Sequence, residues 1–315
     1  MERQMGRVTA DEARKILTGQ GLEQPLLQEA EAFREKYPWQ GAREVTVPRY
    51  PYFGKEILAK ALAALLSGAN LLLVGPKAAG KNILAECLAL LLGRPAWNVS
   101  FHIDVDASYL IGMDTFKEGE VRFRPGPVHE CASQGGVCIL DEINMARNEA
   151  LAVLHSLLDH RRRLEVPGYE ELHLHPATRF IATMNYGYAG TRELNEALLS
   201  RFVVLRLPVP GERELLQLLA YEFPDLQENA ARMMAELFLD IRKKYEEREI
   251  SGRALDLRGL MEALRLIRLG LSAGEALSMG IADKCFDSQE RALVEDLLAL
   301  RLPGDWVARE FFLPL

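Results

Sequence analysis

The stretch from Leu71 to Asn82 holds residue types that can bind the phosphates of a nucleotide. Four apolar residues lead into the loop GPKAAGKN, and the sequence that follows, ILAECLALLLG, reads as a helix. The glycines let the backbone curl so that its N–H groups point at a phosphate, the helix start adds its positive dipole end, and Lys81 adds a full charge. We therefore predict a phosphate-binding loop made of Gly75, Pro76, Lys77, Ala78, Ala79, Gly80, Lys81, Asn82 and Ile83. For the loop taken alone, an ordinary strand–turn–helix corner is the alternative.

Asn82 stands where the usual phosphate-loop pattern has a serine or threonine that offers its hydroxyl to Mg²⁺. An amide oxygen can also bind Mg²⁺, but the side chain is bulkier and cannot donate as a hydroxyl does. We expect the Asn82 Oδ1 atom to bind the metal or a metal-bound water. The substitution also leaves open a site that binds nucleotide and hydrolyses it slowly or not at all.

Two adjacent acids end the apolar stretch VCILDEIN, from Val137 to Asn144. A parallel strand that ends in carboxylates places them at the sheet edge where ligands bind in α/β folds. We expect Asp141 to hold Mg²⁺, directly or through water, and Glu142 to act as the general base on the attacking water. Acids that favour a helix N-terminus explain the pair equally well in isolation. That alternative weakens because a phosphate loop precedes the pair.

Three further polar residues follow in chain order. Asn185 ends the apolar strand FIATMN and could bind the γ-phosphate or the attacking water; a plain turn asparagine is the alternative. Arg201 follows a helix and could reach a neighbouring subunit's nucleotide, or simply meet the helix dipole. Arg258, near the start of a later helix, could contact the same phosphates from a second domain, or lie on the surface. His173 and His175 share a face of a strand-like stretch, and a structural or exposed role is favoured over a metal site.

The elements that would position these residues alternate between strands and helices, which indicates a parallel, doubly wound α/β sheet. Thr9 to Glu12 has capping-box spacing, so a helix should begin there. Pro208 to Gly211 marks a change of composition, after which the chain is patterned as helices. We predict a helical N-terminal arm (1–46), an α/β nucleotide-binding domain (47–208) and a helical lid domain (209–315). The expected strands cover residues 71–74, 96–101, 137–140, 179–184 and 202–207, with helices over 54–66 and 148–159.

The composition limits the class of protein. The 315 residues carry a formal net charge of −7, which argues against a general nucleic-acid-binding surface. The four cysteines contain no CxxC pair, and Cys87 and Cys138 read as buried thiols of a reducing compartment. We find neither the apolar core of a signal peptide nor a stretch fit to cross a bilayer, so we expect a cytoplasmic protein without membrane insertion.

Taken as an ordered set, the motifs GPKAAGKN, VCILDEIN, FIATMN, ELNEALLSRF and LDLRGL resemble those of AAA+ ATPases. DEIN, together with residues 106–131, is similar to the MoxR group near its CbbQ/NorQ branch, and the segment from Thr183 to Phe202 is especially like that branch. The resemblance covers about Tyr52 to Leu269. It implies an AAA+ P-loop domain with a five-stranded parallel sheet, a small all-helical lid, and ATP and Mg²⁺ as cofactors.

By position, the resemblance assigns a role to each candidate residue. Lys81 and its loop bind phosphate, Asp141 supports the metal and Glu142 is the catalytic base. Asn185 is the first sensor. The remaining two are arginines, with Arg201 as the finger acting on the adjacent subunit and Arg258 as the second sensor.

The resemblance also implies partners. Residues 112–127 match a β-hairpin that faces the central pore of a ring in this group, with Lys117, Glu118, Arg122, Phe123 and Arg124 as candidate client contacts. Solvated hairpin residues are the alternative. The implied protein is a homo-oligomeric ring, expected to be a hexamer, that remodels or activates a client with the help of a von Willebrand factor A domain protein. Two alternative functions remain, a slow nucleotide-binding switch and a DNA-linked motor subunit of a defence system. The negative net charge of the chain counts against the motor subunit.

Overall fold

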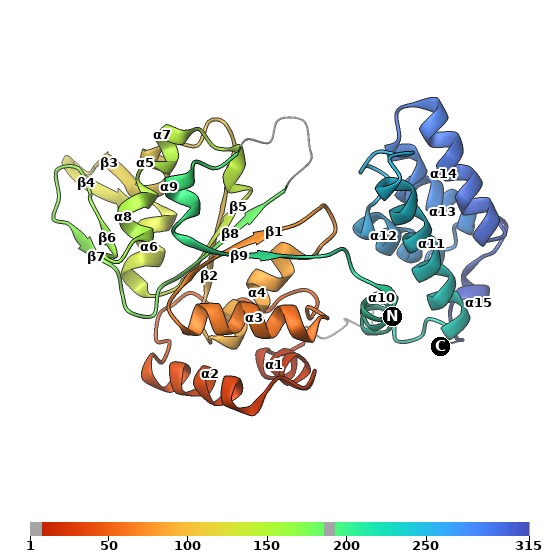
Figure 1. The fold of residues 1–315 in the computed structure, drawn as a ribbon, viewed down its shortest axis with the longest axis horizontal. Coiled ribbons are helices and arrows are strands. Elements are labelled where there is room, and N and C mark those ends of the chain that lie inside the picture. Colours follow the sequence, from red (N-terminus) through yellow and green to blue (C-terminus); the bar gives the residue numbers. More distant parts are fainter. Residues whose placement is uncertain (1–7, 186–192, 315) are drawn as a thin grey trace. The chain divides into compact units, whose positions relative to one another are not determined.

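The computed structural model describes residues 8–185 and 193–314 of the chain. Residues 1–7 of the predicted arm and residues 186–192 of the segment that resembles the CbbQ/NorQ branch therefore lie outside the description. The described chain divides into two units. One comprises residues 8–76 and 80–207, and the other comprises residues 77–79 and 208–314 (Figure 1).

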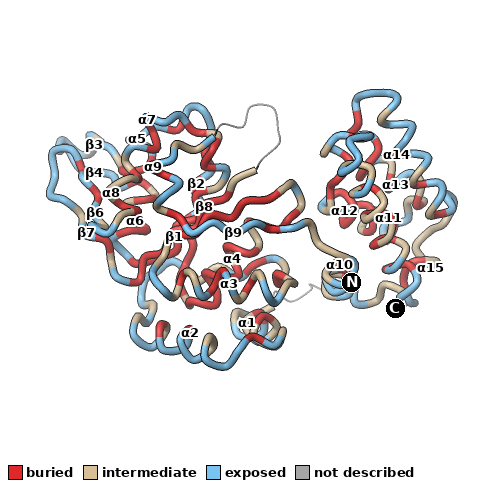
Figure 2. The backbone as a smooth tube through the Cα atoms, in the orientation of Figure 1, coloured by how far each residue is buried: buried red, intermediate tan, exposed pale blue. Residues whose placement is uncertain are grey.

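The first unit is built on a five-stranded parallel sheet with strand order β2-β5-β8-β1-β9, which confirms the predicted fold class. Its central strands β1 and β8 are buried along most of their length, whereas β9 at one edge is largely exposed (Figure 2). The near-continuous apolar sequences suit strands covered on both faces. The strands are β1 (Asn70–Val74), β2 (Ala96–Ser100), β5 (Val137–Asp141), β8 (Arg179–Met184) and β9 (Phe202–Arg206), each close to its predicted bounds.

Helices on the sheet carry the apolar residues that bury it. α3 packs against β1 and β9, α4 against β5 and β8, and α6 against β2 and β5. Cys87 on α4 and Cys138 on β5 are buried free thiols, as predicted. The helices of this unit that belong to the sheet domain are α3 (Lys55–Leu66), α4 (Lys81–Leu91), α5 (Ala107–Ile111), α6 (Pro127–Gln134), η1 (Ile143–Met145), α7 (Asn148–Leu151), α8 (Leu154–Leu158) and α9 (Glu196–Leu199).

The prediction of one continuous helix over residues 148–159 is wrong, because the structure divides this segment into α7 and α8. Ala152 and Val153 keep right-handed helical backbone angles. The His155 N–H, however, bonds to the Ala152 carbonyl three residues back, at 3.2 Å. The segment is thus a helix interrupted by a tighter turn, which apolar periodicity does not reveal.

The N-terminal arm consists of α1 (Ala10–Thr18) and α2 (Gln24–Lys36) and packs into the first unit. Thr9 and Glu12 form the predicted capping box, with the Thr9 N–H donating to Glu12 Oε2 at 2.8 Å. α1 lies against α4, and α2 lies against α3. Arg34 fixes α2 by donating from Nη1 to the carbonyl of Leu91 at 2.7 Å.

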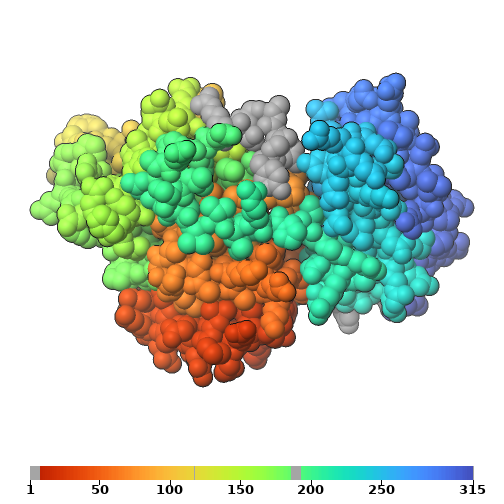
Figure 3. Space-filling model, in the orientation of Figure 1, coloured from red at the N-terminus to blue at the C-terminus, as the bar shows by residue number. Residues whose placement is uncertain are grey.

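Two antiparallel hairpins interrupt the alternation of strands and helices. β3 (Gly112–Lys117) and β4 (Glu120–Pro125) form the hairpin that the family resemblance implies, and its yellow atoms lie at the left margin of the surface in Figure 3. β6 (Arg163–Leu164) and β7 (Leu172–His173) form a second, shorter hairpin that we did not predict. The Tyr169 hydroxyl donates to Asp114 Oδ1 at 2.5 Å and so joins the two hairpins.

The described part of the second unit contains helices and no strand longer than one bridge, between Leu226 and Phe312. This agrees with the predicted all-helical lid. Within the described residues, no helix is long and apolar enough to cross a membrane. The helices are α10 (Glu212–Glu222), α11 (Glu228–Glu246), α12 (Leu257–Arg268), α13 (Ala273–Gly280), η2 (Ala282–Lys284), α14 (Ser288–Arg301) and α15 (Ala308–Phe311).

Asn70, at the start of β1, ties the sheet to two neighbouring segments. Its buried Nδ2 group donates to the carbonyls of Leu158 and Arg201, at 2.8 and 3.0 Å. We predict that Asn70→Ala lowers the free energy of unfolding by about 1–3 kcal/mol, because both carbonyls lose a buried donor. Thermal unfolding measures this. The matched control Asn98→Ala, at an exposed position of β2, should leave the unfolding midpoint unchanged, and an equal effect of both substitutions would contradict the prediction.

Candidate functional site

The loop between β1 and α4 has the backbone shape of an anion cradle. Ala78 and Gly80 adopt left-handed angles, with φ of 64° and 76°, which turn the chain sharply into α4. Gly80 is the N-cap of α4 and offers no side-chain cap, so the first N–H groups of the helix are available to a bound anion. A side chain at Gly80 would be strained by its φ and would place Cβ 3.2 Å from the Tyr52 ring.

Lys81 is buried, with 8% of its surface exposed, and folds back over the loop. Its Nζ donates to the carbonyls of Gly75 and Pro76, both at 2.8 Å. An ammonium has three protons, so one remains for a ligand. Burial lowers the pKa of Lys81 to about 8, and the nearby carboxylates of Asp141 and Glu142 oppose that shift. The charge on Lys81 would therefore be stabilised by an anion in the loop.

The Asp141 carboxylate joins three elements at the carboxyl edge of the sheet. Because Leu140 pairs with Ala182, Asp141 ends β5 beside Thr183 of β8. The Thr183 hydroxyl donates to Asp141 Oδ1 at 2.5 Å, and Asn82 of α4 donates from Nδ2 to Asp141 Oδ2 at 2.9 Å. Each carboxylate oxygen keeps a further lone pair for another partner.

Glu142 is turned away from the strand by a left-handed backbone, with φ 54°. Its N–H donates to the Thr183 hydroxyl at 3.0 Å, so this one hydroxyl fixes both acids. Its exposed side chain accepts at Oε1 from Asn185 Nδ2 at 2.9 Å. The structure thus holds the Glu142 carboxylate in one direction at the open edge of the sheet.

Sequence reasoning missed two members of this cluster, Thr183 and Asn144. Both lie within quoted motifs, and both are polar and buried, with 0% and 2% of their surface exposed. Asn144 donates from Nδ2 to the carbonyl of Asn185 at 3.0 Å, and its Oδ1 has no hydrogen-bond partner in the described chain. A hydroxyl inside the otherwise apolar run FIATM was the available indication for Thr183.

The two candidate arginines lie outside this hydrogen-bonded cluster. Arg201 follows α9 and is half-buried; its Nε donates to the carbonyl of His155 at 3.1 Å, and its Nη1 bonds to the carbonyl of Ala197. Arg258 belongs to the second unit, where it is exposed on the first turn of α12. Lys77 is exposed on the loop, and Ile83 is half-buried in α4.

Of the candidate client contacts on the β3–β4 hairpin, Phe123 packs against the protein, whereas Glu118, Arg122 and Arg124 are exposed. The Phe123 ring packs against those of Tyr169 and His129, with centroids 4.9 and 5.3 Å apart, so it faces the protein. The exposed large apolar side chains are instead Met113, Phe116 and Val121, with 51%, 77% and 64% of their surface exposed. Arg122 and Arg124 are exposed, Glu118 sits at the turn with φ 56°, and the side chain of Lys117 lies outside the described part.

The donor set fits a magnesium nucleotide. Mg²⁺ prefers oxygen ligands, and Asp141 offers a carboxylate. Because a carboxylate only accepts, Asn82 must turn its Nδ2 toward Asp141, which leaves its Oδ1 available on the other side. The loop backbone, the α4 N-terminus and Lys81 suit the phosphates.

Comparison with known proteins agrees with this geometry. Residues 70–202 match the AAA domain (dynein-related subfamily). The chain is 34% identical to the Staphylococcus haemolyticus protein SH1500, over 77% of this chain and 93% of the relative. It is 32% identical to Bacillus subtilis YojN, over 76% and 81% of the two chains. Both relatives are named as uncharacterized proteins. A solved structure of a RuvB mutant from Thermotoga maritima aligns over 70% of this chain and 65% of its own, with a TM-score of 0.46 and 18% identity.

The chain therefore belongs to the AAA ATPase family. Its fold is an AAA+ P-loop domain followed by helices, as the sequence motifs predicted. Within that class, nucleotide binding and ATPase activity are the general properties that the family supports.

The Thr183 hydroxyl gives a direct test of the cluster. We predict that Thr183→Val lowers ATP turnover about ten- to a hundredfold, because Asp141 and the Glu142 backbone both lose their shared partner. Thr183→Ser keeps the hydroxyl and should retain most of the activity. Steady-state phosphate release measures both, and a Thr183→Val protein as active as Thr183→Ser would contradict the prediction, because only serine keeps the hydroxyl.

Proposed function

We propose that the chain is an ATP-hydrolysing AAA+ protein of MoxR type that assembles into a ring and remodels or activates a client protein. The observation that carries this proposal is the continuous set of hydrogen bonds from Asn82 through Asp141 and Thr183 to Glu142 and Asn185. It links the phosphate-loop helix to two strand ends and orients two acids beside the loop.

In this proposal the residues divide the work of hydrolysis. The loop and Lys81 bind the phosphates of ATP, and Asp141 and Asn82 hold Mg²⁺. Mg²⁺ would neutralise charge on the phosphates. Glu142 is the general base for the attacking water, and Asn185 keeps its carboxylate directed. Such positioning, rather than covalent chemistry, accounts for most catalysis of phosphoryl transfer.

The two arginines are proposed to complete the site on assembly. Arg201 would release its own carbonyl partners and contact the nucleotide of the adjacent subunit, since a guanidinium stays charged and forks onto phosphate oxygens. Arg258 would act as the second sensor from the lid domain. A hexameric ring in the cytoplasm is the assembly that the resemblance to MoxR proteins favours.

Client engagement is assigned to the β3–β4 hairpin. Phe116 and Val121 expose apolar surface there, and Arg122 and Arg124 add charge. The resemblance to the CbbQ/NorQ branch supports an enzyme or metalloprotein as the client and a von Willebrand factor A domain protein as the partner.

A slow nucleotide-dependent switch is the second candidate function. The hydrogen bond from Asn82 Nδ2 to Asp141 Oδ2 favours it. The amide fixes the orientation of this carboxylate, and the serine or threonine of the usual pattern has no amide group to do so. In that case nucleotide binding, rather than turnover, would change the state of the protein.

Substitution of the proposed base separates these functions. We predict that Glu142→Gln lowers ATP turnover by about a hundredfold or more, because the water loses its base, while nucleotide affinity stays within about threefold. Glu149→Gln, at an exposed acid of α7, is the matched control and should be neutral. A wild type no faster than Glu142→Gln at every protein concentration would exclude the ATPase and leave the switch.

A mixing experiment tests the action of Arg201 between subunits. Arg201→Ala and Glu142→Gln should each be inactive alone, whereas their mixture should regain part of the turnover. The gain is expected because some interfaces then combine an intact Glu142 with an intact Arg201. Arg206→Ala, at an exposed arginine on β9, is the control and should remain active. A mixture no more active than its two components would contradict action in trans.

A further inference from the structure

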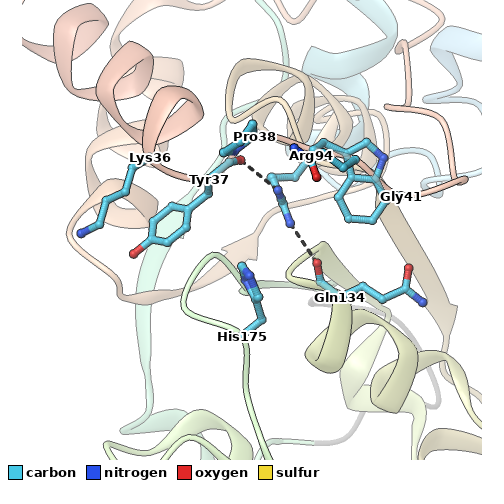
Figure 4. A pocket seen from close by; sticks show the side chains of 9 residues that line it. Lys36, Tyr37, Pro38, Gly41, Arg94, Gln134 and His175 are labelled. Atoms are coloured by element: carbon cyan, nitrogen blue, oxygen red, sulfur yellow. Dashed lines mark hydrogen bonds between the residues drawn. The ribbon is translucent and has the colours of Figure 1, made fainter.

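A cavity of about 360 Å³ lies in the first unit, away from the phosphate loop. Three of its lining residues, Arg94, Gln134 and His175, come just before β2, β5 and β8 respectively. They therefore gather at the amino-terminal edge of the parallel sheet, opposite the edge that holds Asp141. The remaining wall comes from the end of α2 and the residues after it, including Tyr37 and Pro38 (Figure 4). Trp39 also lines the cavity.

Arg94 lies at the centre of the lining residues and is 2% exposed (Figure 4). It donates to three backbone carbonyls, those of Tyr37, Gln134 and Gly135, at 3.0, 2.9 and 2.5 Å. A guanidinium has five N–H donors, so two are left. In the described chain no carboxylate pairs with Arg94, so a full positive charge is buried without an opposite charge.

His175 adds a neutral donor beside Arg94. Its Nδ1 accepts the Ala177 N–H at 3.1 Å, which places the ring proton of the neutral form on Nε2. Burial, and then the Arg94 charge, lower the pKa of His175, so the neutral form prevails at pH 7. The Nε2 atom has no hydrogen-bond partner in the described chain.

Gly135 allows these two groups to approach each other. Its φ of 78° is left-handed, and a Cβ there would lie 2.2 Å from His175 Nδ1 and 2.7 Å from Arg94 Nη2. Any other residue would push the imidazole and the guanidinium out of place. The close approach of the Arg94 guanidinium and the His175 ring therefore depends on a glycine at this position.

The positive charge extends beyond the cavity. Arg162 donates from Nη2 to the carbonyls of Thr178 and His175, at 3.0 and 3.4 Å, and Arg179 donates from Nε to the carbonyl of Leu65 at 2.6 Å. Burial, and then Arg162, lower the pKa of Arg179 to about 10. Neither arginine pairs with a carboxylate of the described chain, and Lys36 adds an exposed ammonium at the rim.

We propose that this cavity binds a small organic phosphate of mononucleotide size. The free donors of Arg94 and His175 would bind the phosphate, and the partly exposed rings of Tyr37 and Trp39 would contact the organic part. A volume of about 360 Å³ suits a small ligand rather than a bare ion. This site is separate from the phosphate loop and does not depend on the function proposed above.

Calorimetric titration of the full chain tests the proposal, with ribose 5-phosphate, AMP and inorganic phosphate as probes. The titrations use Lys81→Ala, which removes the main cation of the phosphate loop. We expect ribose 5-phosphate and AMP to bind this protein. Adding Lys36→Glu or His175→Ala should weaken that binding about fivefold or more. Lys60→Glu, which makes the same charge change on the exposed face of α3, is the matched control and should have no effect.

Three results would overturn the proposal. The first is that neither organic phosphate binds the Lys81→Ala protein. The second is that both bind it, but that adding Lys36→Glu or His175→Ala leaves both the affinity and the unfolding temperature unchanged. The third is that inorganic phosphate binds as tightly as both esters, because the cavity would then recognise the anion alone.

Discussion

The Asp141 carboxylate is the constraint on which the candidate nucleotide site depends. It accepts one hydrogen bond from Asn82 at the start of α4 and one from Thr183 on β8. Thr183 in turn accepts from the Glu142 backbone, and Asn185 directs the Glu142 side chain. Removing this carboxylate would take the acceptor away from the half-buried Asn82 amide and from the buried Thr183 hydroxyl, and would remove the hydrogen bond that joins α4 to β5. The chemistry of the site and the packing of the sheet edge therefore rest on the same contacts.

The parallel sheet separates two kinds of polar site. At its carboxyl edge, acids and amides surround one buried lysine, which suits a cation together with phosphates. At its amino edge, buried arginines bond to backbone carbonyls and have no carboxylate partner among the described residues, which suits an anion alone. Parallel strands make this division possible because all their carboxyl ends meet at one edge. The N-terminal arm closes the second edge and so acquires a structural role there.

Much of the fold was predictable because all five strands read as short, mostly apolar runs, and the central strands β1 and β8 are buried on both faces. The hairpin of β6 and β7 was not, since each strand has two residues and the pairing depends on distant contacts. Asp141 and Glu142 were identified from the strand end they follow. Thr183 was missed because its hydroxyl lies inside an apolar run. His175 was considered only as a metal ligand, and its approach to Arg94 was not predicted because 80 residues of chain separate the two. Phe123 was named as a candidate client contact, but its ring packs against Tyr169 and His129, and Phe116 is the exposed aromatic residue of the hairpin.

The central claim is that Asn82 and Asp141 make this edge of the sheet a magnesium-nucleotide site despite the missing hydroxyl. The most direct test is the affinity for ATP with and without Mg²⁺, measured by equilibrium titration of the wild type and Asn82→Ala. The account predicts that Mg²⁺ strengthens ATP binding to the wild type about tenfold or more and that Asn82→Ala loses much of this gain. Equal affinities of the wild type with and without Mg²⁺ would contradict it.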